Sequence, residues 1–522
     1  MKDTVISPKD EQDVLARLGL EGNPFLHWDA DQEDRLPEYF VPPPYFSAIF
    51  GEPEVPASSI AFAPRGGGKS AQRRMVEIQA DPEDILVITH ADFPFLEQKP
   101  PSQVTLDDHL TEIVRHCLVG LIGRLSLTPS LVGELEPSQK TTLQMLATLY
   151  LDELTRVELE RSLTALKNTA EKLRDFYNKL AFGYNTLGRA ALAALEIPAP
   201  QLPGLAEHGR EAAKNPLTDV QSVGRLALST GLKAIYVLVD RVDEPASTSN
   251  DLPAAYRMIS PLIEDLRVLS LPPFSFKFFV PDEFAPLHAE KGRPDRVQQF
   301  RLNWKPEEIE RMLSKRLSAY SSGRIGSLEE IIDEADAVQW FAQRYLIRFA
   351  EQSPRDMVRL LYSILAEQQR MEVKGHRIRL AAITAGIDTF CRDRAKELAP
   401  PGVLSELKRL GRADFTISEL GSEVFKISTQ AARRKIQAWE GRGVVKRIQD
   451  TTSTGKRPEH HYCLSDIRLA RLALNQLTTI EFWSTKVGVC EQTQCGSTLL
   501  RDWDECPTQI CEDCGEAQTQ LP

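Results

Sequence analysis

The chain has 522 residues, of which 42% are hydrophobic and 26% are charged. This length is too great for one core, and the composition is too ordinary for a disordered chain or a coiled-coil rod, so we expect two to four domains. No apolar run is long enough to cross a membrane, and the polar N-terminus predicts no signal peptide, which favours a soluble, cytoplasmic protein without membrane partners. The net charge of −11, taken over the whole chain, argues against nucleic-acid binding.

Charge and cysteine are unevenly distributed along the sequence. Residues 401–480 contain 14 Lys and Arg against 8 Asp and Glu, a net of +6, whereas residues 481–522 contain 2 against 8, a net of −6. Most of the cysteines lie in the acidic segment. A tight cysteine cluster without a secretory signal favours a metal site over a disulfide framework.

The first 300 residues read as an irregular strap followed by an α/β domain. Residues 1–57 are rich in proline and aromatic residues and are predicted to form the strap, ending in a short helix. In residues 58–300, short apolar runs alternate with helical patterns, which is typical of a mostly parallel sheet covered by helices. The four predicted strands are 58–62, 84–89, 234–239 and 274–280.

A helical block of about residues 100–228 interrupts the strands. Within it, apolar side chains recur every three or four residues from Leu159 to Leu180. This stripe predicts the packing face of a helical hairpin, and the alternative is a coiled coil that binds a partner.

A glycine-rich segment joins the first predicted strand to a helix predicted over residues 71–80. The segment Ala63-Pro64-Arg65-Gly66-Gly67-Gly68-Lys69-Ser70 is typical of a phosphate-binding loop, in which N–H groups at a helix N-terminus cradle an anion. The lysine of such a loop reaches the β and γ phosphates, and the hydroxyl ligates Mg²⁺. The alternative is a glycine-rich surface turn. We predict that ATP is bound by Arg65, Gly66, Gly67, Gly68, Lys69, Ser70 and Ala71.

The third predicted strand ends in a carboxylate. Asp240 is expected beside Ser70, where both would serve a Mg²⁺ ion, and Asp243 or Glu244 would orient the attacking water. The alternative is a carboxylate that ends a buried strand for solubility alone. Because Lys69 and Asp240 are 171 residues apart, the helical block is predicted to be an insertion, a common place for a partner or regulatory surface.

These features resemble the P-loop ATPases of the AAA+ and STAND superclass, especially AAA+ proteins similar to the origin-recognition and cell-division-cycle initiators. The resemblance rests on four segments: the glycine-rich loop, Asn23-Pro24-Phe25 ahead of it, Asp240-Arg241-Val242-Asp243-Glu244, and Ser353-Pro354-Arg355-Asp356 at the start of a predicted helix. It implies Mg²⁺-dependent ATP hydrolysis, a helical lid over residues 301–398, and a homo-oligomer. It also implies that Arg355 is the catalytic sensor 2 arginine, which touches the γ phosphate. The alternative is an ordinary arginine at a helix start.

Three positions depart from that pattern. Ala63 replaces the usual first glycine of the loop, and Arg241 follows Asp240 where AAA+ enzymes usually have a glutamate, which is closer to the STAND form. The fourth strand ends in Val280-Pro281-Asp282 without the Asn or Thr of a sensor 1, so slow hydrolysis is expected. Arg296 is the candidate arginine finger.

Residues 399–482 have the element order of a winged helix. Helices are predicted over 403–410, over 418–425 with Ser418 as its cap, and from 428 to about 440. Wing strands are predicted over 444–448 and 461–464. Together with the local charge of +6, this order predicts DNA binding, with the third helix in the major groove and the wing on the backbone. The alternatives are a protein dock or packing module, and a solvated helix face. The expected DNA contacts are Ser428, Thr429, Gln430, Arg433, Arg434, Lys456 and Arg457.

Residues 483–522 carry two cysteine pairs, Cys490 with Cys495 and Cys511 with Cys514, each followed by glycine. Four thiolates close a tetrahedral structural site, so we predict a zinc ribbon in which the metal supplies stability that so short a chain lacks. Cys506 is a substitute for one ligand. The alternatives are disulfides or free thiols.

The leading hypothesis is therefore an ATP-dependent, DNA-engaging AAA+ ATPase. By resemblance, similar proteins occur in bacterial mobile elements and antiphage islands, which implies genome defence or element maintenance, with an effector or nuclease as a further partner. The second hypothesis is a STAND-type signalling switch, whose winged helix packs on the core. The third is a DNA-binding scaffold that does not hydrolyse ATP.

Overall fold

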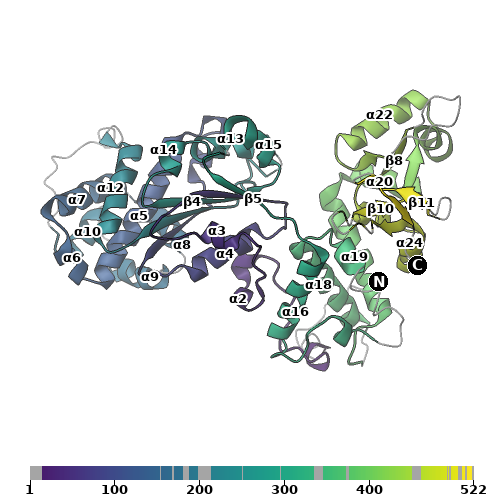
Figure 1. Ribbon diagram of the computed structural model, residues 1–522, viewed down its shortest axis with the longest axis horizontal. Helices are drawn as coiled ribbons and strands as arrows, with labels where there is room; N and C mark the ends of the chain where they lie inside the picture. The colour runs from purple at the N-terminus through teal and green to yellow at the C-terminus, as the bar shows by residue number, and fades with distance from the viewer. Residues whose placement is uncertain are drawn as a thin grey trace. The chain divides into compact units, whose positions relative to one another are not determined.

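The structure is a computed structural model (Figure 1), and it describes the following residues: 14–152, 154–166, 170–179, 187–197, 213–249, 251–293, 295–333, 345–371, 375–448, 460–490, 492, 495, 497–503, 508–511 and 514–519. The chain forms two compact units. One consists of Asp29–Asn303, and the other combines Met1–Trp28 with Trp304–Pro522. Residues 1–57, which the sequence suggested as one strap, thus contribute to both units.

The first unit is built on a parallel sheet of five strands. In sheet order these are β2 (Ile85–His90), β3 (Ala234–Val239), β4 (Phe274–Pro281), β1 (Ser59–Ala63) and β5 (Gln298–Arg301). All four pairings are parallel, with Ala63 opposite Pro281 and Val239 opposite Phe278. The expected parallel α/β sheet is therefore present, and β5 is a strand that the sequence did not predict.

Side chains alternate between the two faces of the sheet along each buried strand, and each face packs against a different set of helices. On β3, Tyr236 and Leu238 pack against the strap helices α2 (Leu36–Tyr39) and α3 (Phe46–Phe50) and against α4 (Lys69–Gln79). Ile235, Val237 and Val239 point to the other face, which packs against the helical insertion. A short 3₁₀ turn, η1 (Ala30–Gln32), precedes α2.

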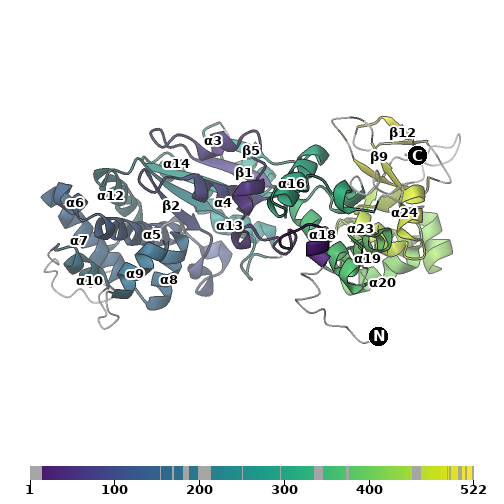
Figure 2. The ribbon, with the colours of Figure 1, turned by 90° about the horizontal axis from the view of Figure 1, so that it is seen from below.

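The insertion between β2 and β3 is helical, and its helices lie together at one end of this unit in both ribbon views (Figures 1 and 2). Its helices are α5 (Leu106–Leu127), α6 (Ser130–Glu134), α7 (Pro137–Leu151), α8 (Arg156–Ala165), α9 (Ala170–Lys179), α10 (Leu187–Ala194) and α12 (Pro216–Ser229). The predicted stripe is buried at Leu159, Leu163, Leu166, Leu173 and Tyr177 and lies on two helices, α8 and α9, that pack on each other and on α5. Leu180, the last residue of that stripe, lies outside the described residues.

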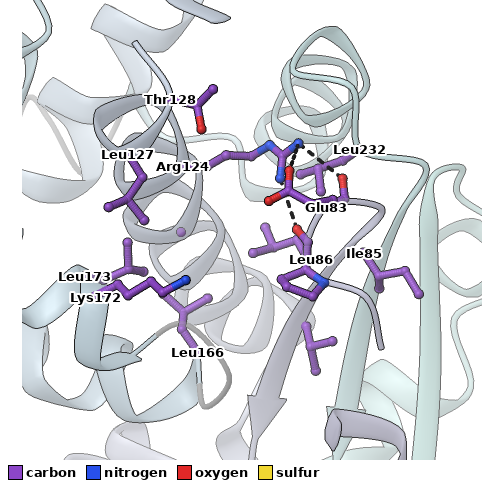
Figure 3. A pocket seen from close by; sticks show the side chains of 13 residues that line it. Glu83, Ile85, Leu86, Arg124, Leu127, Thr128, Leu166, Lys172, Leu173 and Leu232 are labelled. Atoms are coloured by element: carbon purple, nitrogen blue, oxygen red, sulfur yellow. Dashed lines mark hydrogen bonds and ion pairs between the residues drawn. The ribbon is translucent and has the colours of Figure 1, made fainter. Parts of the chain in front are cut away.

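Helix α5 attaches the insertion to the sheet at β2. At Gly120 the helix comes so close that a Cβ would lie 2.9 Å from Leu86 and 3.0 Å from Leu166. Figure 3 shows Arg124 at the end of the same helix, and its guanidinium donates to the carbonyl oxygens of Pro82 at 3.0 Å and Glu83 at 3.1 Å. A cavity of about 110 Å³ lies between these groups and α9. Glycine and arginine together fix how α5 covers the edge strand.

Three further helices complete the unit: α13 (Leu252–Ile263), α14 (Leu266–Leu269) and α15 (Phe284–Lys291). Helix α13 buries Met258, Ile259 and Leu262 in the same core as the insertion. The core therefore runs continuously from the sheet into the inserted helices.

The second unit begins with a helical part made by α16 (Pro306–Ala319), η4 (Glu329–Ile331), α18 (Pro354–Arg370) and α19 (Leu380–Leu398). The N-terminal segment packs on it, because the buried Arg316 of α16 donates to the carbonyl oxygens of Pro24 and His27, the latter at 2.9 Å. Among the described residues, no helix has both the length and the apolar character needed to span a membrane.

A helical and three-stranded part follows. It contains α20 (Pro401–Leu410), β6 (Asp414–Thr416), α21 (Ile417–Glu419), a π-helical turn η5 (Leu420–Phe425), α22 (Thr429–Glu440), β7 (Val445–Arg447) and β8 (His461–Leu464). The strands are antiparallel in the order β6-β8-β7. Helix α21 begins with a capping box of Thr416 and Glu419, so the expected cap at Ser418 is wrong.

The chain ends in two helices and two small hairpins. The helices are α23 (Ile467–Ala473) and α24 (Thr479–Lys486), and the hairpins pair β9 (Val487–Val489) with β10 (Thr498–Leu500) and β11 (Thr508–Ile510) with β12 (Ala517–Thr519). Strands β9 and β12 lie near each other in Figure 2. The buried Trp503 lies so close to Gly488 that a Cβ there would be 2.1 Å from the indole ring.

Candidate nucleotide, nucleic-acid and metal sites

The glycine-rich loop joins β1 to α4 as a tight turn. Gly66 and Gly68 have φ angles of +81° and +93°, a left-handed conformation that other residues rarely adopt. At Gly67 a Cβ would lie 3.0 Å from the carbonyl oxygen of Pro64. The φ angles thus favour glycine at positions 66 and 68, and the close approach of Pro64 favours it at position 67.

Helix α4 presents an uncapped N-terminus to this loop. Gly68 occupies the N-cap position, and no side chain caps the helix. The backbone N–H groups of Lys69, Ser70 and Ala71 in the first turn therefore have no capping side chain. With the positive end of the helix dipole, these groups fit an anion such as a phosphate.

Lys69 lies over the start of its own loop and next to the end of β4. Its Nζ donates to the carbonyl oxygen of Ala63 at 3.2 Å, and the N–H of Asp282 donates to the same oxygen at 3.2 Å. Burial, and then a hydrogen bond shared with Asp282, raise the pKa of Glu283, whereas the nearby positive charge of Lys69 opposes the rise. Two acidic side chains thus lie at the loop.

Sequence reasoning missed this acidic pair because it searched the end of β4 for Asn or Thr. Asp282 and Glu283 directly follow the strand, and the carboxyl ends of parallel strands share one edge of the sheet. Their position directly after a predicted strand could have identified them as candidate site residues.

Asp240 directly follows β3, which β4 separates from β1. Its side chain is 1% exposed, and both carboxylate oxygens are engaged. Oδ2 accepts from Nε of Arg73 at 2.9 Å, and Oδ1 accepts from the N–H of Arg241 at 2.9 Å. Neither of these contacts is to Ser70, the expected neighbour of Asp240. Arg73, four residues after Lys69, is a site residue that sequence reasoning missed.

The two acids after Asp240 differ in environment. Asp243 is half-buried, whereas the Glu244 side chain is 58% exposed. The Oε2 atom of Glu244 lies 3.7 Å from Nε of Arg241. Burial raises the pKa of Glu244, and the charge of Arg241 works against this. The hydroxyl of Thr248 donates to the Val242 carbonyl at 3.0 Å and fixes the turn that carries both acids.

The two predicted arginines lie in different units. Arg296 is exposed beside Asp295, 3.6 Å away, in the unit that contains the loop. Arg355 is half-buried in the first turn of α18 in the other unit, and the Ser353 hydroxyl caps this helix by accepting from the N–H of Asp356. The structure leaves the role of each arginine a prediction.

Helix α22 exposes the side chains that were expected to contact DNA. Ser428, Thr429, Gln430, Arg433 and Arg434 are all exposed, and Ser428 also caps the helix through the N–H of Ala431 at 3.3 Å. Lys435 differs, because it is half-buried, paired with Glu406, and 4.9 Å from the Phe425 ring. Lys456 and Arg457 lie outside the described residues.

Four cysteine side chains meet between the two hairpins at the C-terminus. The sulfur atoms of Cys490, Cys495, Cys511 and Cys514 all lie within 4.8 Å of one another. The Sγ atoms of Cys490 and Cys514 are 3.5 Å apart, and those of Cys495 and Cys511 are 3.6 Å apart. This set fits a tetrahedral thiolate site, for which zinc is the usual metal. Cys506 lies outside the described residues.

No protein-family model and no curated protein matches the chain. Among solved structures, the chain is similar to the Orc1 protein of Aeropyrum pernix in complex with DNA, with 11% identity and a TM-score of 0.36. The match covers 86% of this chain and 96% of that one. A similarity this low supports no inference about the present chain.

Proposed function

We propose that this chain binds and hydrolyses ATP at the loop between β1 and α4 and engages DNA through the part that contains α22. The observation that carries the ATP proposal is the loop itself. It has two left-handed glycines, an uncapped helix N-terminus and a lysine at the first helical position, all at the carboxyl edge of a parallel sheet. These are the groups that a triphosphate requires.

The proposed roles follow from where each group lies. Lys69 and the first-turn amides of α4 would hold the phosphates, and Ser70 and Asp240 would hold Mg²⁺, which neutralises phosphate charge when bound. Asp243 and Glu244 remain the proposed groups for orienting water. Asp282 and Glu283, beside Lys69, are further carboxylates at the same edge.

Equilibrium binding and turnover of ATP with Mg²⁺ test the nucleotide proposal. Lys69→Ala should lose turnover and most affinity, since it removes a charged phosphate contact. Lys291→Ala is the matched control, because this exposed lysine lies in the same unit, at the end of α15. Wild-type protein that binds no ATP, or equal behaviour of the two variants, would contradict the proposal.

The DNA proposal rests on exposure and charge. Arg433 and Arg434 point from an exposed helix face, within a segment whose net charge is +6 from 14 basic and 8 acidic residues. An exposed helix with two adjacent arginines next to a small antiparallel sheet is suited to groove and phosphate contacts. We therefore interpret this part as a DNA-binding winged helix.

Duplex binding measured over a range of salt concentrations tests this interpretation. Losing both arginines should lower affinity and reduce the salt slope by roughly two, about one per phosphate contact. Arg392→Ala with Lys396→Ala removes the same charge from an exposed face of α19 and is the control. No duplex affinity at low salt, or an equal loss in the control, would exclude the proposed interface.

The four clustered cysteines are proposed to bind one structural Zn²⁺. All four ligand positions would be filled by thiolates, so the ion would stabilise the hairpins and have no open position for catalysis. Metal analysis should find one zinc per chain, and Cys511→Ser should lower that number.

A specific contact favours the signalling switch as a second candidate. Arg468 at the start of α23 pairs with Asp356 of α18 at 2.6 Å, and Arg394 of α19 reaches the same carboxylate at 3.0 Å. The C-terminal part is thus tied to the helices α18 and α19 by a buried carboxylate, as expected for a packing module. Sizing the protein with ATP and Mg²⁺, with and without DNA, separates the candidates, because assembly independent of DNA favours the switch.

A further inference from the structure

Two arginines connect the strap to the end of β3. Arg73 of α4 contacts Asp240 through Nε at 2.9 Å and Asp31 of the strap through Nη2 at 2.6 Å. Arg241, next to Asp240, contacts the other oxygen of Asp31 through its own Nη2 at 2.7 Å. Asp31 therefore bridges two guanidinium groups, one of which holds Asp240.

The Arg73 end of this network is buried, and three carboxylates surround the Arg73 guanidinium. Arg73 and Asp240 are each 1% exposed, and the third partner of Arg73 is the fully buried carboxylate of Glu77. The charges of Asp240, Glu77 and Asp31 raise the pKa of Arg73 against the effect of burial, so the guanidinium stays charged. A buried ion pair costs so much desolvation that it contributes little net stability, which makes a role in orienting Asp240 the better explanation of its presence.

The strap also forms hydrogen bonds before Asp29, in its part that belongs to the second unit. Asp29 is the first residue of the first unit, and it pairs with Arg241 at 3.2 Å. A few residues earlier, in the second unit, the carbonyl oxygens of Pro24 and His27 accept from Arg316. The short segment from Pro24 to Asp31 is thus bonded to arginines within each unit.

We propose that Asp31 and Arg73 are positioning residues for Asp240, so that the strap sets the orientation of the carboxylate that is proposed to hold Mg²⁺. The proposal rests on the proposed nucleotide site. With Asp31 in place, the Arg73 charge is shared among three carboxylates. Without Asp31, Arg73 attracts Asp240 more strongly and competes with a divalent cation for it.

Equilibrium binding of a fluorescent ADP analogue to the full chain, with EDTA and over a Mg²⁺ titration, tests this without relying on turnover. Asp31→Asn should leave binding in EDTA unchanged and raise the half-saturating Mg²⁺ concentration roughly 10-fold or more, as for outer-shell partners of other metal sites. Glu38→Gln is the control, because this exposed strap carboxylate pairs with the half-buried Arg35 one turn away. Arg73→Lys keeps the positive charge but loses the forked geometry of the guanidinium. It should change the half-saturating Mg²⁺ concentration and leave the fold intact.

The outcomes are distinguishable. If wild-type protein binds no nucleotide in either buffer, the proposed nucleotide site fails. If it binds nucleotide but Asp31→Asn and Arg73→Lys show wild-type Mg²⁺ dependence, or if Glu38→Gln shows the same shift, the positioning role is overturned. If Asp31→Asn does not fold, Arg73→Lys decides alone: a shifted Mg²⁺ dependence supports the role, and an unchanged one overturns it.

Discussion

Buried histidines should make the stability of the unit formed by Asp29–Asn303 depend on pH. Burial also lowers the pKa of His288 on α15, and the other three, His90, His109 and His116, lie on or next to α5. His90 ends β2, and its Nε2 lies 3.0 Å from Nδ1 of His109 on α5. His109 in turn bonds to the carbonyl oxygen of Met258 at 2.9 Å, and His116, on the same helix, bonds to the Ser162 hydroxyl at 3.0 Å. Burial lowers the pKa of His90 well below its usual value, that of His109 to about 4, and that of His116 to about 3.

The sign and size of the effect follow from proton linkage. Below pH 6.5 the unfolded chain protonates these histidines, whereas the folded unit keeps them neutral, so the unfolded state binds more protons. The free energy of unfolding must then fall as the pH drops from about 6.5 to about 4. At pH 5 each neutral histidine costs about 2 kcal/mol, so the three together remove roughly 6 kcal/mol.

Hydrogen exchange of the α5 amides between pH 5 and pH 8, corrected for intrinsic rates, measures this loss locally. A local measurement is needed because a chain of two units does not unfold in a single two-state transition. His109→Gln should remove about one third of the loss caused by the three histidines at α5, or about 2 kcal/mol at pH 5. The exposed His376 gives the control, His376→Gln, with an unchanged slope. A stability that is flat over this range, or a slope that His109→Gln leaves undiminished, would refute the reasoning.

Three more changes test packing and metal binding. Lys277 is buried in β4, donates to the carbonyl oxygen of Ile49 at 2.5 Å, and has its pKa lowered by burial to about 7. Since the unfolded lysine stays protonated to about pH 10.4, stability should rise with pH between 7 and 10, and Lys277→Met should stabilise the unit by roughly 1–3 kcal/mol at pH 7 and less at pH 10, measured by urea unfolding. A gain that is the same at both pH values would contradict this. Gly488→Ala should displace Trp503 and shift its fluorescence to longer wavelength, and an unshifted spectrum would contradict the packing. Removing zinc with a chelator should abolish amide protection in β9–β12 and leave that of α5 intact, whereas protected hairpins without metal would argue against a structural zinc site.

The strands and the loop were predictable because local pattern determines them. Buried strands between helices read as short apolar runs, so β3 was predicted at residues 234–239, where it lies. Strand β5 could not be found in this way. It is an edge strand with the polar sequence Gln298–Arg301, and within the described part of the chain it pairs with β1 alone. Its formation depends on the neighbouring strand and not on its own composition.

Capping shows a similar limit on a smaller scale. Ser418 is a good N-cap residue, but Thr416 with Glu419 three residues later forms a capping box, which satisfies two backbone N–H groups instead of one. Both patterns are present in the sequence, and the helix begins at the capping box of Thr416 and Glu419.

The surroundings of Asp240 could not be derived from sequence, because their meaning arises only when three distant segments meet. In sequence, Arg73 is an unremarkable charge on a helix, and Asp31 belongs to an acidic stretch of the strap. In the fold, Arg73 contacts both Asp31 and Asp240, and the Asp240 carboxylate is buried, so one guanidinium links the strap to the residue after β3. An isolated carboxylate at a strand end would bind Mg²⁺ according to its own charge alone. Because Asp240 is paired with Arg73, we expect its affinity for a cation to depend on a residue of α4 and, through Asp31, on a segment more than 200 positions earlier in the chain.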